Sequence, residues 1–370
     1  MITAQNEQDT PVSLQQYGTI PSPQLHTQSN PQLVTAPTSG SAHSHYDLSP
    51  TVPVASISLS AITDPIAGTE LSQKPAIGTA LCIYRGHSNS VYAITWSPDG
   101  HRIASGGYDG TVQIWNATDG GHVLTYRSHF NTVYAVAWSP DGQRIASGGY
   151  DGTVQIWNAT DGSHILTYKG HLNTVTSLVW SPDGKYIASG GTSVQVWNVV
   201  DGSHILTYKG HLNTVKSVVW SPDGQRIASS SDDRTVQVWR VADGGQAITY
   251  KGHSDPVTSV AWSPDGKCII SGSGSFDKTV QVWNAASGSH IFTYTGHTDT
   301  VKSVTWSPDG KHIVSGGNDK TAQIWNATNG SIAFIYKGHS DPVNSVVWSP
   351  DRQRIASGSG DHTVQVWKAV

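Results

Sequence analysis

One stretch of this chain is repeated seven times, and the repeat constrains the fold more than any other feature. Each copy opens with a Gly-His or Ser-His pair, and successive His residues are 42, 42, 40, 42, 44 and 42 residues apart. These residues are His87, His129, His171, His211, His253, His297 and His339. A fixed period of this size predicts an array of similar units that bury their apolar faces against one another.

All fourteen tryptophans fall at two positions of the repeat. The first position precedes Ser-Pro-Asp and holds Trp96, Trp138, Trp180, Trp220, Trp262, Trp306 and Trp348. The second closes a Val-Gln-Val or similar run and holds Trp115, Trp157, Trp197, Trp239, Trp283, Trp325 and Trp367. Because no tryptophan lies elsewhere, the repeat places all of the largest side chains of the chain.

Within one copy the residue types predict four short strands and no helix. In the first copy the expected strands are residues 91–96, 102–105, 111–115 and 122–126. A Ser-Pro-Asp-Gly turn joins the first two, since Pro presets φ and Gly accepts the last corner. Each copy is therefore predicted to be a four-stranded antiparallel meander. Its inner strands are almost continuously apolar, which predicts that neighbouring sheets cover both faces, as they would in a ring of seven.

The Gly-His pair, the Ser-Pro-Asp-Gly turn and the later Ser-Gly-x-x-Asp-x-Thr-Val-x-Val-Trp motif resemble the WD40-repeat (WD-repeat) β-propeller family. The resemblance covers residues 79–370, and the near-identical copies look like those of bacterial propellers. It implies an all-β, seven-bladed β-propeller of four-stranded antiparallel blades. The residue after the closing Trp is Asn in five copies, Arg240 in the fourth and Lys368 in the seventh, never the Asp that names the family. This position lies at an exposed strand end, so the fold is expected to tolerate the difference.

The two ends of the repeated region complement each other. Residues 79–84 resemble a fourth strand without its first three, whereas the last copy stops after its third strand. We therefore predict that the N-terminal strand completes the seventh blade and closes the ring, which removes two open sheet edges. The propeller is expected to span residues 79–370. Residues 1–78, which hold nine of the eighteen prolines and neither Arg nor Trp, are predicted to form a disordered tail rich in Ser, Thr, Pro and Gln.

Charge separates the two regions of the chain. The formal net charge of -4 arises within residues 1–78, and the repeated region carries equal numbers of acidic and basic residues. A neutral ring argues against nucleic acid or an anionic membrane as a partner. The N-terminus lacks the pattern of a signal peptide, and no apolar run is long enough to span a membrane. A cytoplasmic and monomeric propeller is therefore expected, with no cofactor and no metal.

Six copies contain a His, a strand Ser, a turn Asp and a closing Trp. Ser, His and Asp are also the components of a nucleophilic triad, but six near-equivalent sets at a fixed period predict scaffolding, and no catalytic residue is expected. The resemblance to the family implies that each set forms a hydrogen-bonded chain that satisfies buried polar groups. The sets are His87, Ser105, Asp109 and Trp115; His129, Ser147, Asp151 and Trp157; His211, Ser229, Asp233 and Trp239; His253, Ser271, Asp277 and Trp283; His297, Ser315, Asp319 and Trp325; and His339, Ser357, Asp361 and Trp367.

The third copy departs from this pattern. It is two residues shorter than most, and its turn, Gly190-Gly191-Thr192-Ser193, contains no Asp. His171 is therefore expected to lack a partner, and the third blade is expected to be the loosest of the seven.

Positions that vary between copies are the candidates for binding a partner, because the invariant positions hold the ring together. Three variable positions lie beside the His loop and the Asp turn, so they are predicted to share one rim near the channel mouth. The resemblance implies that partner proteins are bound at the matching positions of the family. The candidate residues are Tyr92, Tyr108, Tyr134, Tyr150, Lys216, Asp232, Phe276 and Lys302.

Clustered Tyr beside a few charges is typical of the centre of a protein interface. We therefore expect a non-enzymatic scaffold that binds a protein or peptide partner on this rim. Alternatively, Tyr108 and Tyr150 only cover the blade edges. Two other classes stay open: an enzyme or small-ligand binder that uses the central channel, which would need a unique cluster of carboxylates, His or metal ligands there, and a carbohydrate binder that uses the same tyrosines.

Overall fold

The computed structural model describes residues 75–369 except residue 128. The predicted tail at residues 1–78 lies almost entirely outside the described residues, so its disorder and the domain boundary at residue 79 stay predictions. At the start of the described part, residues 75–79 form a turn whose Gly78 amide donates to the carbonyl oxygen of Lys368 over 2.9 Å.

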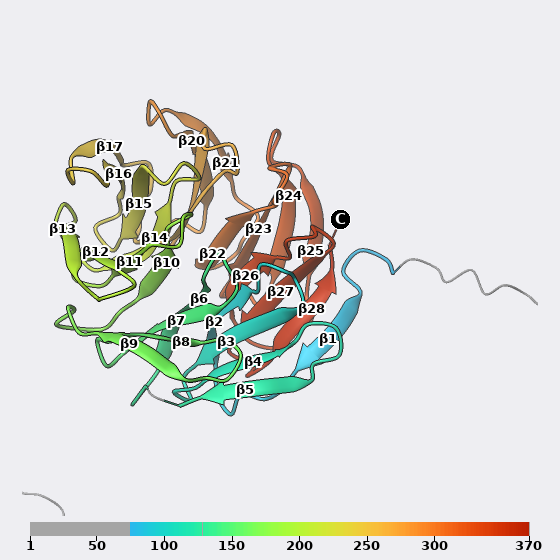
Figure 1. The fold of residues 1–370 in the computed structure, drawn as a ribbon. Coiled ribbons are helices and arrows are strands. Elements are labelled where there is room, and N and C mark those ends of the chain that lie inside the picture. Colours follow the sequence, from blue (N-terminus) through green and yellow to red (C-terminus); the bar gives the residue numbers. More distant parts are fainter. Residues whose placement is uncertain (1–74, 128, 370) are drawn as a thin grey trace, which may run out of the picture. The chain divides into compact units, whose positions relative to one another are not determined.

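The described residues form seven four-stranded antiparallel sheets, the blades, arranged in a ring (Figure 1). Blade one consists of β2 (Val91–Trp96), β3 (Arg102–Gly107), β4 (Val112–Asn116) and β5 (His122–Tyr126). Blade two consists of β6 (Val133–Trp138), β7 (Arg144–Gly149), β8 (Val154–Asn158) and β9 (His164–Tyr168). Blade three consists of β10 (Ser177–Trp180), β11 (Tyr186–Gly190), β12 (Val194–Asn198) and β13 (His204–Tyr208).

The remaining four blades repeat the same order. Blade four consists of β14 (Val215–Trp220), β15 (Arg226–Ser231), β16 (Val236–Arg240) and β17 (Gln246–Tyr250). Blade five consists of β18 (Val257–Trp262), β19 (Cys268–Ser273), β20 (Val280–Asn284) and β21 (His290–Tyr294). Blade six consists of β22 (Val301–Trp306), β23 (His312–Gly317), β24 (Ala322–Asn326) and β25 (Ile332–Tyr336). Blade seven consists of β26 (Val343–Trp348), β27 (Arg354–Ser359), β28 (Val364–Lys368) and β1 (Ala80–Tyr84).

The second strand of each blade is longer than its sequence suggests. In blade one, β3 continues through Gly106 and Gly107, which pair with Val112 and Val91, where a turn was expected. A Cβ on Gly106 would come within 2.7 Å of Val133 in the next blade. Gly106 therefore marks the close approach of two blades, whereas a Cβ on Gly107 would meet the carbonyl oxygen of Ser90 in the same copy.

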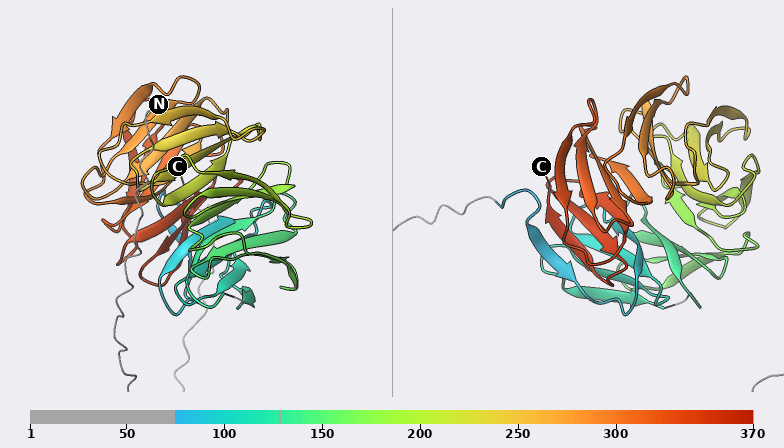
Figure 2. Two further views of the ribbon diagram at one scale, coloured as in Figure 1. Left: turned by 90° about the vertical axis from the view of Figure 1, so that its left-hand side faces the viewer. Right: turned by 180° about the vertical axis from the view of Figure 1, so that it is seen from behind.

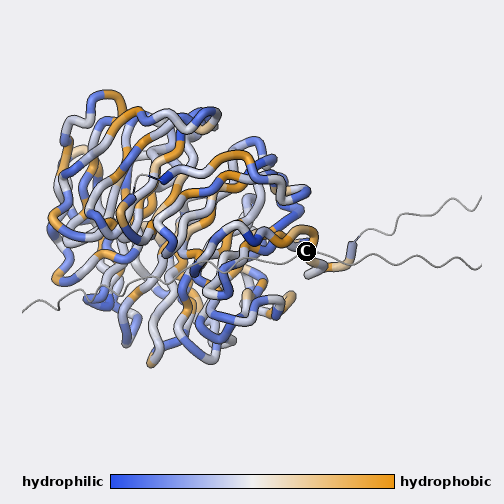
Figure 3. The backbone as a smooth tube through the Cα atoms, turned by 90° about the horizontal axis from the view of Figure 1, so that it is seen from below, coloured by the Kyte–Doolittle hydropathy of each residue, from blue (hydrophilic) through white to orange (hydrophobic). Residues whose placement is uncertain are grey.

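The hydrophobic core lies between the blades. One cluster joins Val112 and Ile114 of blade one to Val133 and Ile145 of blade two, and the other interfaces repeat this pattern. Figure 3 colours the backbone by hydropathy and shows hydrophobic stretches that alternate with hydrophilic ones along the chain. Because each blade is covered on both faces, its stability depends on its two neighbours.

Blade seven is completed from the other end of the chain. Strand β1 pairs antiparallel with β28, and the register runs from Ala80 opposite Trp367 to Tyr84 opposite Val364 (Figure 1). A core cluster that includes Tyr84, Val364 and Val91 then joins blade seven to blade one. The predicted seven-bladed propeller, closed by its N-terminal strand, is confirmed, and Figure 2 shows the closed ring from two further directions.

Candidate functional site

A buried His stands at the entry to every blade, and in six blades it pairs with the turn Asp. The Nδ1 atom lies 2.8–3.2 Å from an Asp oxygen in these six blades. In all seven, Nε2 lies 2.7–2.9 Å from the Oγ of the strand Ser. An ionised carboxylate can only accept, so Nδ1 donates to it, and Nε2 forms the hydrogen bond with the Ser hydroxyl. The hydrogen bonds therefore link Ser, His and Asp in one chain.

The Trp indole joins this chain in only some blades. The Nε1–H group donates to the strand Ser over 3.1–3.4 Å in Trp115, Trp197, Trp239 and Trp367. The same group has no partner in Trp157, Trp283 and Trp325. This differs from the four-member chain implied by the family. The Ser oxygen is already engaged by His at a shorter distance, so its contact with the indole is long and easily lost.

The turn carboxylates are held in their ionised form. Although burial alone raises the pKa of Asp109, hydrogen bonds from His87 and Thr111 and the charge interaction with His87 lower it to about 2. The same balance lowers the pKa of Asp151 and of Asp319 to about 2. Three blades thus share one electrostatic environment, and none of the three is differentiated as a catalytic site would be.

A second link between neighbouring blades was not singled out from the sequence. The Tyr84 ring stacks on Trp115 with centroids 4.6 Å apart, and its hydroxyl donates to Gln113 Oε1 over 2.6 Å. Gln113 Nε2 in turn donates to the carbonyl oxygen of Gly86 over 3.2 Å. The Tyr-to-Gln hydrogen bond recurs in all seven blades at 2.5–2.9 Å. The signal was present, since this Tyr and this Gln recur at fixed positions in every copy.

The position that follows the first Val of each inner strand faces the channel mouth. Tyr134, Thr176, Lys216, Thr258 and Lys302 occupy it in five consecutive blades, and all five line one cavity of about 650 Å³. The structure thus brings together five of the seven residues at this variable position. We call this opening, with those five residues on its wall, the channel mouth.

Two tyrosines of the first two blades meet at this rim. The rings of Tyr92 and Tyr134 lie 5.4 Å apart at an angle of 47°. Burial, together with the neighbouring phenols of Tyr134 and Tyr108, raises the pKa of Tyr92. Tyr108 and Tyr150 are 53% and 58% exposed. We call Tyr92, Tyr108, Tyr134 and Tyr150 the tyrosine rim, and that Tyr108 and Tyr150 share one surface with the other two stays a prediction.

The charged candidates Lys216 and Lys302 lie on the inner strands of blades four and six. Lys216 Nζ pairs with Asp232 over 2.9 Å. Partial burial in the channel mouth and then the charge of Lys216 lower the pKa of Lys302. Phe276 is exposed in the longer turn of blade five, where its amide donates to Asp255 over 2.9 Å. Lys216 and Lys302 therefore share one opening, whereas Phe276 is not among the residues that line it.

Three exposed apolar residues were not among the binding candidates predicted from the sequence. Phe130, Leu172 and Leu212 directly follow the entry His of blades two, three and four, and they are 98%, 94% and 93% exposed. The other copies have Ser or Thr at this position. That change of residue type was the available signal for an apolar edge on three adjacent blades.

The third blade lacks the carboxylate, as its sequence indicates. His171 Nε2 lies 2.7 Å from Ser189 Oγ, but its Nδ1 has no hydrogen-bond partner. The residue is only 7% exposed, and burial lowers its pKa to about 4. The expectation that His171 lacks a partner is confirmed, and whether blade three is the loosest stays a prediction.

We predict that His171 makes the propeller less stable as the pH falls from about 6.5 to about 4. The unfolded chain takes up a proton near the ordinary pKa, whereas the folded chain does so only near pH 4, so acid favours unfolding within this window. The loss should reach about 2–3 kcal/mol at pH 4.5. Urea unfolding at pH 7 and pH 4.5 should show a smaller difference for His171→Gln than for the unchanged chain. Equal differences would contradict the assignment.

Two features are absent from the residues that the structure describes. Among the residues that the structure describes, no group of three or more His, Cys, Asp or Glu side chains is placed to hold a metal ion. The described residues also contain no helix that is long and apolar enough to cross a membrane.

A closed ring of seven repeated blades, with a buried polar chain in its scaffold and variable residues on one rim, defines a repeat β-propeller. The chain belongs to the WD40 family, because the family pattern "WD domain, G-beta repeat" matches residues 78–116, 120–158, 162–198, 202–240, 244–284, 288–326 and 330–368. Propellers of this family generally act as protein-interaction scaffolds and are typically non-catalytic.

One curated relative shares a short part of the repeat. The chain is 53% identical over 36 residues to the protein named "Periodic tryptophan protein 2 homolog" from Dictyostelium discoideum. The match covers 10% of this chain and only 4% of that relative. The match is therefore consistent with the repeated unit, and it says nothing about the activity of the whole protein.

Proposed function

We propose that this propeller is a monomeric cytoplasmic scaffold that binds a protein or peptide partner on the tyrosine rim and the adjoining channel mouth. The carrying observation is the contact between Tyr92 and Tyr134, whose rings lie 5.4 Å apart beside the exposed Tyr108. A pair of rings that already support each other presents apolar area at a small cost in side-chain entropy. The phenol hydroxyls add hydrogen-bonding capacity at the edge of that area.

The charged residues supply specificity in this proposal. Lys216 is paired with Asp232, whereas Lys302 forms no ion pair within the described residues, although the charge of Asp299 acts on it. A partner that places an acidic group near Lys302 gains attraction, and one that places a basic group there is disfavoured.

We predict that the double substitution Tyr92→Ala and Tyr134→Ala weakens partner binding at least about tenfold, because truncating two aromatic anchors removes at least about 1.4 kcal/mol of binding free energy. The free energy of unfolding should fall by no more than about 1–2 kcal/mol, since both side chains are only partly buried. Peptides selected from a random displayed library against the immobilised full-length chain provide the ligands, and fluorescence anisotropy measures their affinities.

A matched control removes two apolar side chains elsewhere. Ile165 and Ile205 lie on the outer strands β9 and β13 and are about half exposed, so Ile165→Ala with Ile205→Ala should leave the same peptides bound. Peptides that bind the tyrosine variant as tightly as the unchanged chain would remove the proposal.

A further inference from the structure

The short turn of blade three leaves hydrogen-bond donors that elsewhere in the ring hold a carboxylate. In five blades the amide of the residue after the entry His donates to the turn Asp over 2.8–3.2 Å. A Thr hydroxyl donates to the other oxygen of that Asp, as Thr235 does to Asp233 over 2.6 Å. The backbone amide of the same Thr also donates to the Asp, as that of Thr235 does to Asp233 over 2.9 Å. The carboxylate is thus bound by the imidazole, two amides and one hydroxyl.

All three kinds of donor are present in blade three. Ser193 takes the place of Thr235, because the Gly191 amide donates to the Ser193 carbonyl oxygen over 3.1 Å, as the Ser231 amide does to Thr235 over 3.2 Å. Within the described part of the chain, His171 Nδ1 is unpartnered, and neither the Leu172 amide nor the Ser193 hydroxyl is engaged in a hydrogen bond.

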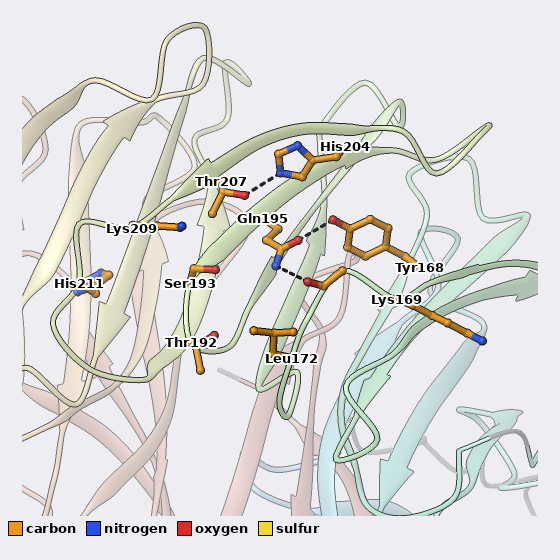
Figure 4. A pocket seen from close by; sticks show the side chains of 11 residues that line it. Tyr168, Lys169, Leu172, Thr192, Ser193, Gln195, His204, Thr207, Lys209 and His211 are labelled. Carbon is orange, nitrogen blue, oxygen red and sulfur yellow. Dashed lines mark hydrogen bonds between the residues drawn. The ribbon is translucent and has the colours of Figure 1, made fainter. Parts of the chain in front are cut away.

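A groove opens beside these donors. Leu172, Thr192, Ser193 and Lys209 are among the residues that line a cavity of about 790 Å³ between blades three and four (Figure 4). Its lining also includes Lys169 and contains no Asp or Glu. In Figure 4 the side chain of Lys209 extends toward Thr207 and Ser193, whereas that of Lys169 points away from them.

The next pair of blades provides the comparison. A cavity of about 490 Å³ between blades four and five is lined by Leu212, Thr249 and Lys251, which match Leu172, Thr207 and Lys209. There the lining includes the carboxylate of Asp233, which is absent from the groove of blade three. The two sites thus differ by one internal carboxylate, which the second site contains together with Arg234 and the first site lacks.

We propose that the groove between blades three and four binds a carboxylate of a peptide ligand, held by the Leu172 amide, the Ser193 hydroxyl and Lys209. The ligand supplies the negative group that the turn Asp supplies in six other blades. The proposal deepens the proposed function and rests on it, because the peptide is taken to be part of the partner on the tyrosine rim.

The position of Thr192 connects the two surfaces. This residue lines both the groove and the channel mouth, so an extended segment seated in the channel mouth enters the groove by passing over a single side chain. The short turn makes this path. Five of the other blades place three residues where blade three has Thr192 alone, and blade five places five residues there. A carboxylate is favoured over a phosphate because the matching amide and hydroxyl hold a carboxylate in blade four, where Leu212 and Thr235 both donate to Asp233.

The test compares short peptide libraries on the immobilised full-length chain. The libraries are randomised except at one central position, which is Glu in the first, Gln in the second and phosphoserine in the third. We expect the Glu library to be retained about tenfold better than the Gln library, and the advantage to shrink as salt is raised. Equal retention of the Glu and Gln libraries overturns the proposal, and a stronger preference for phosphoserine than for Glu replaces carboxylate by phosphate.

Two sets of variants locate the effect. Lys209→Ala should remove most of the preference for Glu, whereas Lys251→Ala, its equivalent one blade further, should leave it unchanged. Replacing Thr192 by Asn-Asp-Gly rebuilds the turn of the other blades with its own carboxylate, and Asn-Asn-Gly rebuilds it without one. Only the graft that contains Asp should abolish the preference for Glu, because its carboxylate occupies the donors. The same graft should raise the free energy of unfolding, so stability should rise while the preference for Glu falls. A Glu preference that survives the Asp graft and Lys209→Ala overturns the proposed site.

The same libraries separate this inference from the function on which it rests. If Glu and Gln peptides bind equally and both are lost in the Tyr92→Ala and Tyr134→Ala variant, the tyrosine rim stands and the carboxylate site fails. If the preference for Glu persists unchanged in that variant, the groove binds its ligand alone and the tyrosine rim fails.

Discussion

Removing strand β1 is expected to destabilise the whole propeller by on the order of 5 kcal/mol or more. The strand supplies the outer edge of blade seven and also buries Tyr84 against Trp115 of blade one, with the ring centroids 4.6 Å apart. Its loss exposes the edge of β28 and opens the cluster that joins the last blade to the first. A chain that starts after Tyr84 should therefore unfold at a much lower temperature than one that starts at residue 76. Near-ultraviolet circular dichroism, which reports on the packed tryptophans, provides the measurement.

Two controls separate ring closure from a general effect of truncation. Deletion of residues 1–75 is predicted to leave the melting temperature nearly unchanged, since the closing strand remains. Tyr84→Ala keeps the strand and removes only the stacked ring and its hydrogen bond to Gln113, so it should cost about 3 kcal/mol, less than the full deletion. If the chain without β1 melted together with the chain that starts at residue 76, the closing strand would carry none of the stability assigned to it.

The period of the sequence was sufficient to predict the blades and their closure, because strand spacing and apolar inner strands leave few ways to cover every sheet. The period was less informative about the contacts between neighbouring blades. Gly106 was expected in a turn, yet it pairs with Val112 in a strand, and it is a glycine there because a side chain would strike Val133. The contact depends on the distance between blades, which no single copy contains.

The candidate site shows the same limit. Sequence variation selected Tyr92 and Tyr134 as candidates, but their mutual contact follows from the angle between two blades. The absence of an Asp in the third turn was visible, and His171 is unpartnered as a result. The groove beside it was not predictable, because its lining combines residues of blade three with Tyr168 of blade two and with the entry loop of blade four. The link from Tyr84 to Gln113 was missed for a different reason: each residue alone looks like an ordinary strand residue.

Loss of the entry His should have unequal effects in blades three and four, although their surrounding sequences are nearly the same. His211→Ala removes the Nδ1 donor, 2.8 Å away, from Asp233, whose carboxylate is almost fully buried. A buried charge that loses its partner is strongly destabilising, and the hydrogen bonds from Thr235 and Leu212 offset part of the loss, so we expect a cost of about 3 kcal/mol.

His171→Ala leaves no such charge behind. It removes one hydrogen bond, to Ser189, together with the packing of a ring whose Nδ1 was already unpartnered, so the expected cost is about 1–2 kcal/mol. Urea unfolding at pH 7 measures the free energy of unfolding of both variants. At this pH neither the carboxylates nor the buried His171, whose pKa is lowered, change their protonation. The Asp233→Asn substitution completes a double-mutant cycle in blade four, and its coupling with His211→Ala should account for most of the difference between the two blades. Equal losses for the two His variants would mean that packing of the ring, and not its bond to the carboxylate, stabilises the entry to each blade.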